Sequence, residues 1–416
     1  MMRGTILAAT LFAATALGAG IAKADPDNFV EVQRGKYLAT VGDCMGCHVG
    51  PDGKSMAGGN LLETPFGNIA VPNITPDNKT GIGTWSAEDF YQAMHVGKAP
   101  DGTHLYPAFP YTSFTKMTRE DTDAIYAYLR AQEAVENEVD RDTLPFPFNI
   151  RLAMWGWNWL NFTPGEFKPD PQKSEAYNRG AYLVEGPGHC GLCHTPRNFM
   201  GGDAAGDELK GGALQGWFAP NISADKHVGI GAWSEAEIVD YLRTGHTARS
   251  AASGPMAEVV SYSTSHMTEG DLKAIATYLR ERGAAGEAKP QPLAASEPRM
   301  QAGAAIYDDT CAACHVGDGS GVAGMFPRLA DNQLVQQTDP SGILHVILQG
   351  SQSVATPHAV TAPSMPALGW RLSDQQVADV ATFIRNSWGN AAAPVTADQV
   401  KSMREETAGV AMPARH

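Results

Sequence analysis

Three stretches of the sequence share the pattern C-x-x-C-H: CMGCH at 44–48, CGLCH at 190–194 and CAACH at 311–315. This pattern is the attachment site of c-type haem. The two thiols add across the porphyrin vinyl groups, and the histidine that follows supplies an imidazole nitrogen to the iron. The pattern therefore predicts three covalent haem c groups. They are attached at Cys44, Cys47, Cys190, Cys193, Cys311 and Cys314, with iron ligands His48, His194 and His315.

Other chemistries of paired cysteines fit this spacing less well. An exported chain with six cysteines would ordinarily form three disulfides, but all six lie in pairs two residues apart. A structural zinc site needs two further ligands for each pair, and a thioredoxin-like redox pair does not need a histidine after it three times. Haem attachment uses every cysteine and leaves no disulfide.

Each motif lies in the same local frame. A short helical segment with a glycine near its start precedes it, and a helix with a Ser or Thr cap follows it. A glycine allows the first helix to cross closely over an aromatic residue on the last helix. The glycines are Gly35, Gly180 and Gly303, the caps Thr118, Thr268 and Ser373, and the aromatic residues Tyr128, Tyr278 and Phe383. This helix pair around a haem resembles the core of small class I cytochromes c, three times over.

The chain therefore divides into tandem units, and the predicted fold class is all-α. The first two units are closer to each other than to the third, since P-N-I-T/S and G-I-G-x-W-S occur in both, about 148 residues apart. We expect three class I cytochrome c domains, each a small helical bundle around a covalent haem. The predicted segments are a signal peptide (1–24), domain 1 (25–130), a tryptophan-rich join (131–174), domain 2 (175–280), an Ala/Pro linker (281–298), domain 3 (299–390) and a tail (391–416). For the Trp of each G-I-G-x-W-S motif, core packing and contact with the haem edge are equally good interpretations.

The composition and the first residues indicate the compartment. An apolar run over 5–22, after Arg3, ends in the small-x-small sequence Ala22-Lys23-Ala24, which predicts an exported protein. With 31 basic and 45 acidic residues, the net charge of −14 argues against a nucleic-acid partner. We therefore expect a periplasmic protein that associates peripherally with the inner membrane.

The tryptophan-rich join holds an unusual run, Trp155-Gly156-Trp157-Asn158-Trp159. One interpretation is a clasp packed against a neighbouring domain. The other is a docking surface for a partner subunit or for the membrane interface, where indoles favour a half-wet position.

A methionine sulfur opposite the histidine is the usual sixth iron ligand in such domains. Met365, in S-M-P-A before the last helix, fits this role in the third unit, and Met256 fits it in the second, with Met267 as a rival. The first unit has Phe109 near the corresponding position. There Met117 is our prediction, with His104 or an open iron as alternatives.

The sequence as a whole resembles the triheme cytochrome c subunits of membrane-bound bacterial dehydrogenases, namely the gluconate, sorbitol, fructose and quinoprotein alcohol dehydrogenase complexes. The repeated P-N-I-T/S…G-I-G-x-W-S, the run C-H-T-P-R-N at 193–198 and the tryptophan-rich join carry the resemblance. It implies a subunit that is not an enzyme on its own. Such a subunit takes electrons from a flavoprotein or quinoprotein (PQQ-bearing) catalytic subunit and delivers them to ubiquinone, with peripheral membrane contact. It also implies that the carbonyl of Pro327 accepts the other N–H of His315.

Two other classes of function stay open. The chain fits an electron acceptor for a molybdenum hydroxylase-type dehydrogenase, which uses similar triheme modules. It also fits a stand-alone haem carrier, or a haem enzyme that binds a small ligand at an open first iron.

Overall fold

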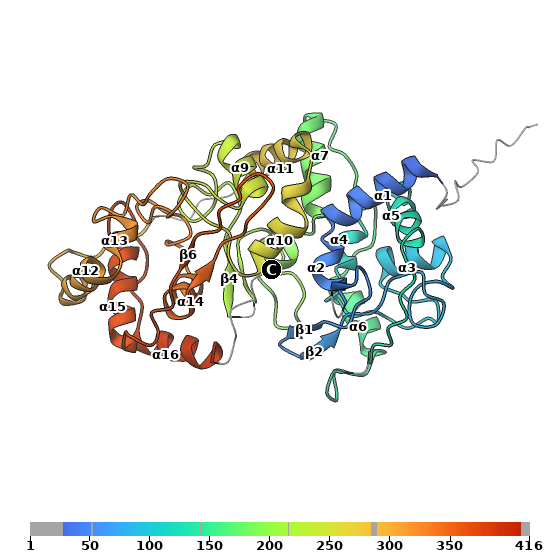
Figure 1. Ribbon diagram of the computed structural model, residues 1–416, viewed down its shortest axis with the longest axis horizontal. Coiled ribbons are helices and arrows are strands. Elements are labelled where there is room, and N and C mark those ends of the chain that lie inside the picture. Colours follow the sequence, from blue (N-terminus) through green and yellow to red (C-terminus); the bar gives the residue numbers. More distant parts are fainter. Residues whose placement is uncertain (1–27, 51–52, 142, 215, 284–288, 409–416) are drawn as a thin grey trace, which may run out of the picture.

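The computed structural model describes residues 28–50, 53–141, 143–214, 216–283 and 289–408. The predicted signal peptide lies outside the described residues. Figure 1 shows three groups of helices in chain order along the long axis of the molecule, the first blue and the last red. The fold is mostly helical, as predicted. The described part also contains three two-stranded antiparallel sheets, which the all-α prediction did not include.

Each group of helices is built on one crossing pair. The first pair is α1 (Phe29–Val41) with α5 (Arg119–Arg130). The middle pair is α7 (Glu175–Glu185) with α11 (Glu269–Glu281), and the third pair is α12 (Pro298–Thr310) with α15 (Asp374–Arg385). The same packing thus occurs three times in the described chain.

A glycine lies at every crossing, as the sequence predicted. A Cβ at Gly35 would lie 1.8 Å from the carbonyl oxygen of Ala124, and one at Gly180 would lie 2.0 Å from that of Ala274. At Gly303 the distance to the carbonyl oxygen of Asp379 would be 2.3 Å. The Cβ atoms of the predicted aromatic residues, Tyr128, Tyr278 and Phe383, lie at the same three contacts. No side chain fits in these gaps, so the helix backbones approach as closely as glycine allows.

The last helix of each pair begins at the predicted cap. The hydroxyls of Thr118 and Thr268 accept hydrogen bonds from backbone N–H groups three residues on, both at 3.2 Å. Ser373 and Gln376 form a full capping box. The cap residues therefore fix where the last helices start.

Shorter elements fill the space around the pairs. The first group adds α2 (Cys44–His48), β1 (Leu61–Thr64), β2 (Gly67–Ala70), α3 (Ala87–Val96) and α4 (Tyr111–Phe114). The middle group adds α8 (Gly191–His194), β3 (Gly212–Leu214), β4 (Trp217–Ala219), α9 (Glu235–Thr244), α10 (Pro255–Tyr262) and η2 (Thr264–His266). The third adds α13 (Ala312–His315), α14 (Ser341–Gln349), β5 (Ser351–Gln352), β6 (Ser364–Met365) and α16 (Ala397–Glu406).

The three sheets are hairpin-like contacts of two strands each. Strand β1 pairs with β2 from Leu61↔Ala70 to Thr64↔Gly67, and β3 pairs with β4 from Gly212↔Ala219 to Leu214↔Trp217. Strand β5 pairs with the more distant β6, which brings Ser351 opposite Met365. The first two sheets occupy the same place in their groups, shortly after the C-x-x-C-H motif.

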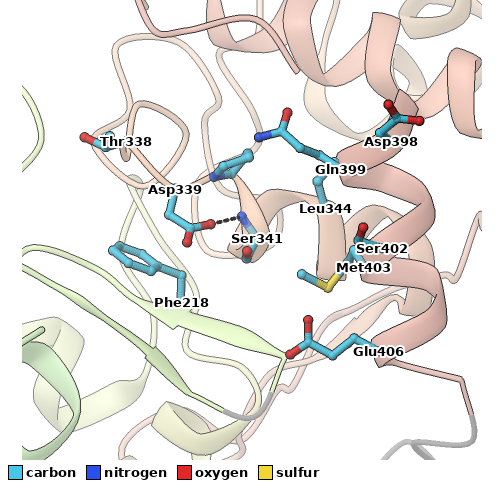
Figure 2. A pocket seen from close by; sticks show the side chains of 11 residues that line it. Phe218, Thr338, Asp339, Ser341, Leu344, Asp398, Gln399, Ser402, Met403 and Glu406 are labelled. Carbon is cyan, nitrogen blue, oxygen red and sulfur yellow. Dashed lines mark hydrogen bonds between the residues drawn. The ribbon is translucent and has the colours of Figure 1, made fainter. Parts of the chain in front are cut away.

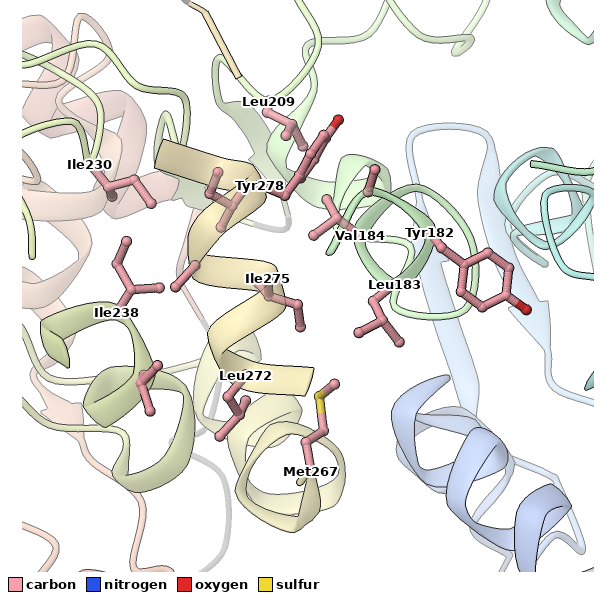
Figure 3. Close-up of a cluster of buried hydrophobic side chains, with 14 of the residues drawn as sticks. Tyr182, Leu183, Val184, Leu209, Ile230, Ile238, Met267, Leu272, Ile275 and Tyr278 are labelled. Carbon is pink, nitrogen blue, oxygen red and sulfur yellow. The ribbon is translucent and has the colours of Figure 1, made fainter. Parts of the chain in front are cut away.

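Each pair has its own buried apolar cluster. In the middle group, Leu183 of α7 and Ile275 of α11 lie between the two helices, whereas Leu272 points from α11 away from α7, as Figure 3 shows. In the same view the Tyr182 ring points away from this cluster. Each group therefore has its own hydrophobic core, as expected for a repeated unit.

The join and the tail both contain helices. Helix α6 (Ala153–Asn161) carries the tryptophan-rich run. The predicted tail segment contains α16, which packs against α14 and α15 through Val400 and Met403. Within the described ranges, no helix is both long and apolar enough to cross a membrane.

Candidate haem-attachment sites

The three C-x-x-C-H motifs form three short helices, α2, α8 and α13, each just after the first helix of its pair. None of the side chains in these helices is fully buried by the protein. All six thiols are free. Each motif therefore keeps some exposed surface on which a planar group could pack.

Each motif histidine is held by a proline carbonyl. The Nδ1 atom lies 2.8 Å from the carbonyl oxygen of Pro72 for His48, and 2.7 Å from that of Pro220 for His194. For His315, Nδ1 lies 3.1 Å from the carbonyl oxygen of Pro327, the contact that the resemblance implied. Because a carbonyl only accepts, Nδ1 carries the proton and Nε2 keeps its lone pair. The same tautomer is fixed three times.

The environment keeps these imidazoles neutral. Burial lowers the pKa of His48 to about 4, although the bond to Pro72 acts in the opposite direction. Burial likewise lowers the pKa of His194 and of His315. A neutral imidazole with a free Nε2 is the form that binds a metal.

Burial favours the protonated form of five of the six thiols. Burial raises the pKa of Cys44 and Cys190 to about 12, and that of Cys47 and Cys311 to about 11. Zinc sites require thiolates, whereas haem attachment adds an S–H across a vinyl double bond. At the first two motifs, two protonated thiols next to one neutral, oriented imidazole fit a covalent haem.

Comparisons with known proteins agree with this geometry. The cytochrome c family profile matches residues 32–133 and 300–388. The cytochrome c subunit of gluconate 2-dehydrogenase from Pantoea cypripedii is 40% identical over 92% of this chain and 91% of its own length. The chain belongs to the cytochrome c subunits of dehydrogenase complexes.

Further members differ in the dehydrogenase that they serve. The cytochrome c subunit of a quinone alcohol dehydrogenase from Gluconacetobacter polyoxogenes is 41% identical over 94% of this cytochrome c subunit and 88% of its own length. One of the subunits of nicotinate dehydrogenase from Pseudomonas putida is 42% identical over 85% of this chain, but only 30% of that protein is covered.

The family profile does not match the middle group, yet that group has the same construction as the other two. It has the helix crossing at Gly180, the motif helix α8 and the bond between His194 and Pro220. The cytochrome c subunit therefore repeats one arrangement at all three motifs.

The predicted sixth ligands differ in burial. Met256, in the first turn of α10, and Met365, in β6, are both half-buried. Met117 is fully buried in the first hydrophobic core, and Met267, which also stands just before a Thr cap, is buried in the middle one. Met117 thus has the surroundings of a core residue. All three methionine ligands stay predictions.

The alternatives at the first motif also have defined places. Phe109 packs edge-on against Phe114, with ring centroids 5.5 Å apart. The Nδ1 atom of His104 is buried and has no hydrogen-bond partner within the described ranges. The loop that corresponds to the Met256 loop therefore offers an aromatic ring and an unpaired imidazole nitrogen in place of a methionine.

The first and middle motifs lie next to each other. The Nε2 atom of His189, just before the middle motif, lies 3.2 Å from the carbonyl oxygen of Gly42, just before the first. The Ser263 hydroxyl donates to the carbonyl of Val41 at 2.9 Å, and α10 packs against α2. The loops just before the first and middle motifs, which we call the attachment loops, therefore pack directly against each other.

A reciprocal pair of tyrosine–aspartate contacts flanks these loops. Tyr37 of the first pair donates to Asp271 of the middle pair at 2.6 Å, and Tyr182 of the middle pair donates to Asp121 of the first. Asp271 also accepts two hydrogen bonds from Arg179, at 2.7 and 2.8 Å. Burial alone would raise the pKa of Asp271, but the bonds from Arg179 and Tyr37 outweigh it and lower that pKa.

Pro72 and Pro220 were not singled out from the sequence. They lie 24 and 26 residues after their histidines, because a β-hairpin intervenes, whereas Pro327 follows His315 by only 12. A signal was present, since both prolines open the repeated P-N-I-T/S motif. The asparagine of each motif accepts a backbone N–H two residues on, which fixes the turn that aims the carbonyl.

The tryptophans of the repeated G-I-G-x-W-S motif have different surroundings. Trp233 is buried and its indole N–H donates to Gln333 of the third group at 3.1 Å, whereas Trp85 is half-buried against the first core. Core packing therefore accounts for Trp233.

An open cavity of about 720 Å³ lies between β4, α14 and α16. Figure 2 shows that its lining includes Phe218, Leu344, Met403 and Glu406. None of its lining residues belongs to a C-x-x-C-H motif.

Proposed function

We propose that this chain is the electron-transfer subunit of an exported dehydrogenase complex. It consists of three tandem class I cytochrome c domains, at 25–130, 175–280 and 299–390, and holds three covalent haem c groups. It takes electrons from a flavin- or PQQ-bearing catalytic subunit and delivers them to ubiquinone. The observation that carries the proposal is the threefold recurrence of glycine crossing, C-x-x-C-H helix and histidine–proline bond.

The roles of the residues follow from their chemistry. The six cysteines form the thioethers, and the Nε2 atoms of His48, His194 and His315 bind the irons. Met365, Met256 and Met117 are the proposed sixth ligands. The bound haem supplies a reversible one-electron Fe(III)/Fe(II) couple. The protein holds each imidazole in one tautomer and one orientation, so that the ligand need not reorganise when the iron changes charge.

The packing of the domains supports transfer along the chain. The attachment loops of the first two domains are in direct contact through His189 and Gly42. The third domain contacts the middle one through buried side chains such as Gln333 and Gln337. Contact between neighbours is what a relay of electron carriers within one chain requires.

The names of the relatives support the choice of partners. They are subunits of gluconate, alcohol and fructose dehydrogenases, and the alcohol dehydrogenase is named for quinone. We therefore place the chain on the periplasmic face of the inner membrane, in peripheral contact with the lipid that dissolves ubiquinone.

Purification of the tagged full-length chain from detergent-solubilised membranes tests this proposal. We expect a flavoprotein or quinoprotein to co-purify, and the haem absorbance to shift to the reduced form when a sugar, sugar acid or alcohol is added. Recovery of the chain alone, unreduced by any such substrate, would contradict the proposal and favour a free carrier.

A second candidate partner follows from the nicotinate dehydrogenase relative, which is 42% identical to this chain. A similar cytochrome module occurs in that protein, so the chain also fits a molybdenum hydroxylase-type dehydrogenase. Molybdenum in the co-purified protein, with reduction by an N-heterocyclic substrate, would favour this partner over a flavoprotein or quinoprotein.

A ligand-binding haem enzyme is distinguished by carbon monoxide. If Met117, Met256 and Met365 all bind iron, the reduced protein should show almost no spectral change with carbon monoxide. A response of about one haem in three, abolished by changes in the first domain only, would show that the first iron is open.

A further inference from the structure

Helix α6 turns its polar side chains toward the protein and exposes most of its large apolar ones. Its polar residues point into the protein. Asn158 accepts a hydrogen bond from the Tyr111 hydroxyl at 2.6 Å, and Asn161 accepts one from the side-chain amide of Asn198 at 2.9 Å. Trp157 is buried, and its indole N–H donates to the carbonyl of Met200 at 2.9 Å. These bonds fasten α6 to both the first and the middle domain, which confirms the clasp interpretation.

The opposite side of the same helix is apolar and exposed. Leu152, just before α6, and Trp155 and Trp159 are spaced three and four residues apart, so they share one face. Their exposed fractions are 79%, 68% and 78%. Leu160 and, in the preceding loop, Phe146 are also exposed. We call these five residues the tryptophan face.

Exposed apolar side chains are concentrated here. Seven of the 17 exposed large hydrophobic residues in the described part of the chain come from positions 146–160. Phe148 continues the surface onto the β1–β2 hairpin, where its ring centroid lies 5.1 Å from that of Phe66. In Figure 1, α6 and the loop before it lie at the lower edge of the molecule. Exposed apolar side chains gathered in one short segment of a folded protein mark an interaction surface.

The charge of this segment indicates what it contacts. The chain has 45 acidic residues, yet none lies between Leu144 and Gly165, and Arg151 is the only charged residue there. Arg151 is turned back onto the protein, since it donates to the carbonyls of His104 and Arg141 and lies over the ring of Tyr106. The segment that carries the tryptophan face therefore has no carboxylate of its own to repel anionic lipid headgroups.

We infer that the tryptophan face inserts into the headgroup–acyl boundary of a phospholipid bilayer. Tryptophan and leucine on one side of a helix, with polar side chains on the other, are features of helices that lie in the membrane interface. The inference rests on the proposed function, because ubiquinone is dissolved in the bilayer and the chain must reach it there. It deepens that function by assigning the membrane contact to α6 and the loop before it.

Co-sedimentation of the full-length haem-loaded chain with vesicles tests the inference. The vesicles are phosphatidylcholine with and without phosphatidylglycerol, and the Soret absorbance of the pellet measures binding. We expect the double variant Trp155→Ser/Trp159→Ser to bind about tenfold or more weakly, because each indole removes a large apolar area from water. The matched control is Trp370→Ser, a residue that is 84% exposed in the third domain and should leave binding unchanged.

Two results would overturn the inference. One is unchanged vesicle binding by the double variant, or by Leu152→Ser/Leu160→Ser, which tests the same face without tryptophan. The other is loss of the catalytic subunit from the double variant in detergent, which would make the face a protein interface. The vesicle assay needs no substrate, so a failure of the proposed electron transfer is scored separately from a failure of membrane binding.

Discussion

The contact between the first and middle domains differs in kind from the contact between the middle and third. The first is reciprocal and rests on hydrogen bonds to carboxylates: Tyr37 donates to Asp271 and Tyr182 donates to Asp121, so each domain gives the other the same residue types. Such exchange is the signature of a two-fold-like interface between similar partners. Its carboxylates are also held by arginines of their own domains, Arg34 and Arg179.

The second contact uses uncharged side chains of both domains. Trp233 of the middle domain donates to Gln333, and the Nδ1 atom of His345 of the third lies 2.9 Å from the carbonyl oxygen of Gly216. A segment of the third domain inserts buried amides into the middle domain. The Gln337 side chain accepts the backbone N–H of Asn221 at 3.0 Å and donates to the carbonyl of Val228 at 2.5 Å. The Asn332 side chain donates to the carbonyl of Arg249 at 2.7 Å. The two more similar domains thus pair with each other, and the divergent one is attached through hydrogen bonds that carry no net charge.

The largest effect is expected from a substitution at the helix crossing, a feature that all three domains share. Gly180→Ala places a Cβ 2.0 Å from the carbonyl oxygen of Ala274. We expect α7 and α11 to separate and the middle domain to lose about 3 kcal/mol or more of stability, measured by calorimetry of the haem-loaded protein. Gly270→Ala on the same α11, where a Cβ meets only the Thr268 hydroxyl at 4.0 Å, is the control. Equal stability of the two variants would contradict close helix crossing.

A smaller effect is expected from a substitution at the contact between the first and middle domains. Asp271→Asn keeps the shape of the side chain but removes the negative charge of the carboxylate to which Arg179 and Tyr37 donate hydrogen bonds. Because the Arg179 side chain is still 38% exposed, solvent screens part of the loss, and we expect about 1–3 kcal/mol. Asp374→Asn, at a pair in which the carboxylate side chain is 33% exposed against 12% for Asp271, should cost less than about 1 kcal/mol. A larger loss for Asp374→Asn than for Asp271→Asn in thermal unfolding would reverse the expected order.

The pH dependence sharpens the comparison further. The pKa of Asp271 is lowered in the folded protein, so its ionised form stabilises the fold. That stability is fully present above the ordinary pKa of about 3.9 and is lost as the pH falls through the lower folded value. The difference in Tm between the wild type and Asp271→Asn should therefore be full at pH 6 and shrink toward pH 3. For Gln337→Leu, which replaces a side chain that does not titrate, the difference should stay constant. A constant difference for Asp271→Asn would argue against an ionised carboxylate at this contact.

The smallest effect concerns a single hydroxyl. Tyr37→Phe removes one hydrogen bond to Asp271 and leaves both bonds from Arg179 in place. We expect a loss of about 0.5–1.5 kcal/mol in urea unfolding. The same change at Tyr182 should have a similar effect if the interface is reciprocal, and a much larger loss at only one of the two positions would show that it is not.

Local signals were enough to predict the repeated frame. The motif cysteines, the glycine of each first helix and the Thr or Ser cap of each last helix are read within a few residues, and the structure confirms the crossings and the caps. Contacts between distant segments could not be read in this way. Tyr37 and Asp271 are 234 residues apart, and nothing in their neighbours indicates that they meet.

The candidate site shows the same division. His315 and Pro327 are joined by a short loop and were linked by the resemblance, but the hairpins that separate His48 from Pro72 and His194 from Pro220 hid the same bond. The sequence also did not predict which side of α6 is buried. Trp155, Trp157 and Trp159 look equivalent in the sequence, but the side of α6 that contacts Tyr111 and Met200 buries Trp157 and leaves the other two exposed. That choice depends on tertiary contacts.

The intact mass of the purified mature chain under denaturing conditions, compared with the chain in which Cys190 and Cys193 are both replaced by Ser, tests the central claim most directly. The account predicts a wild-type mass increased by three haems and a variant mass increased by two. A wild-type mass without covalent haem, or with the six cysteines oxidised to disulfides, would contradict it.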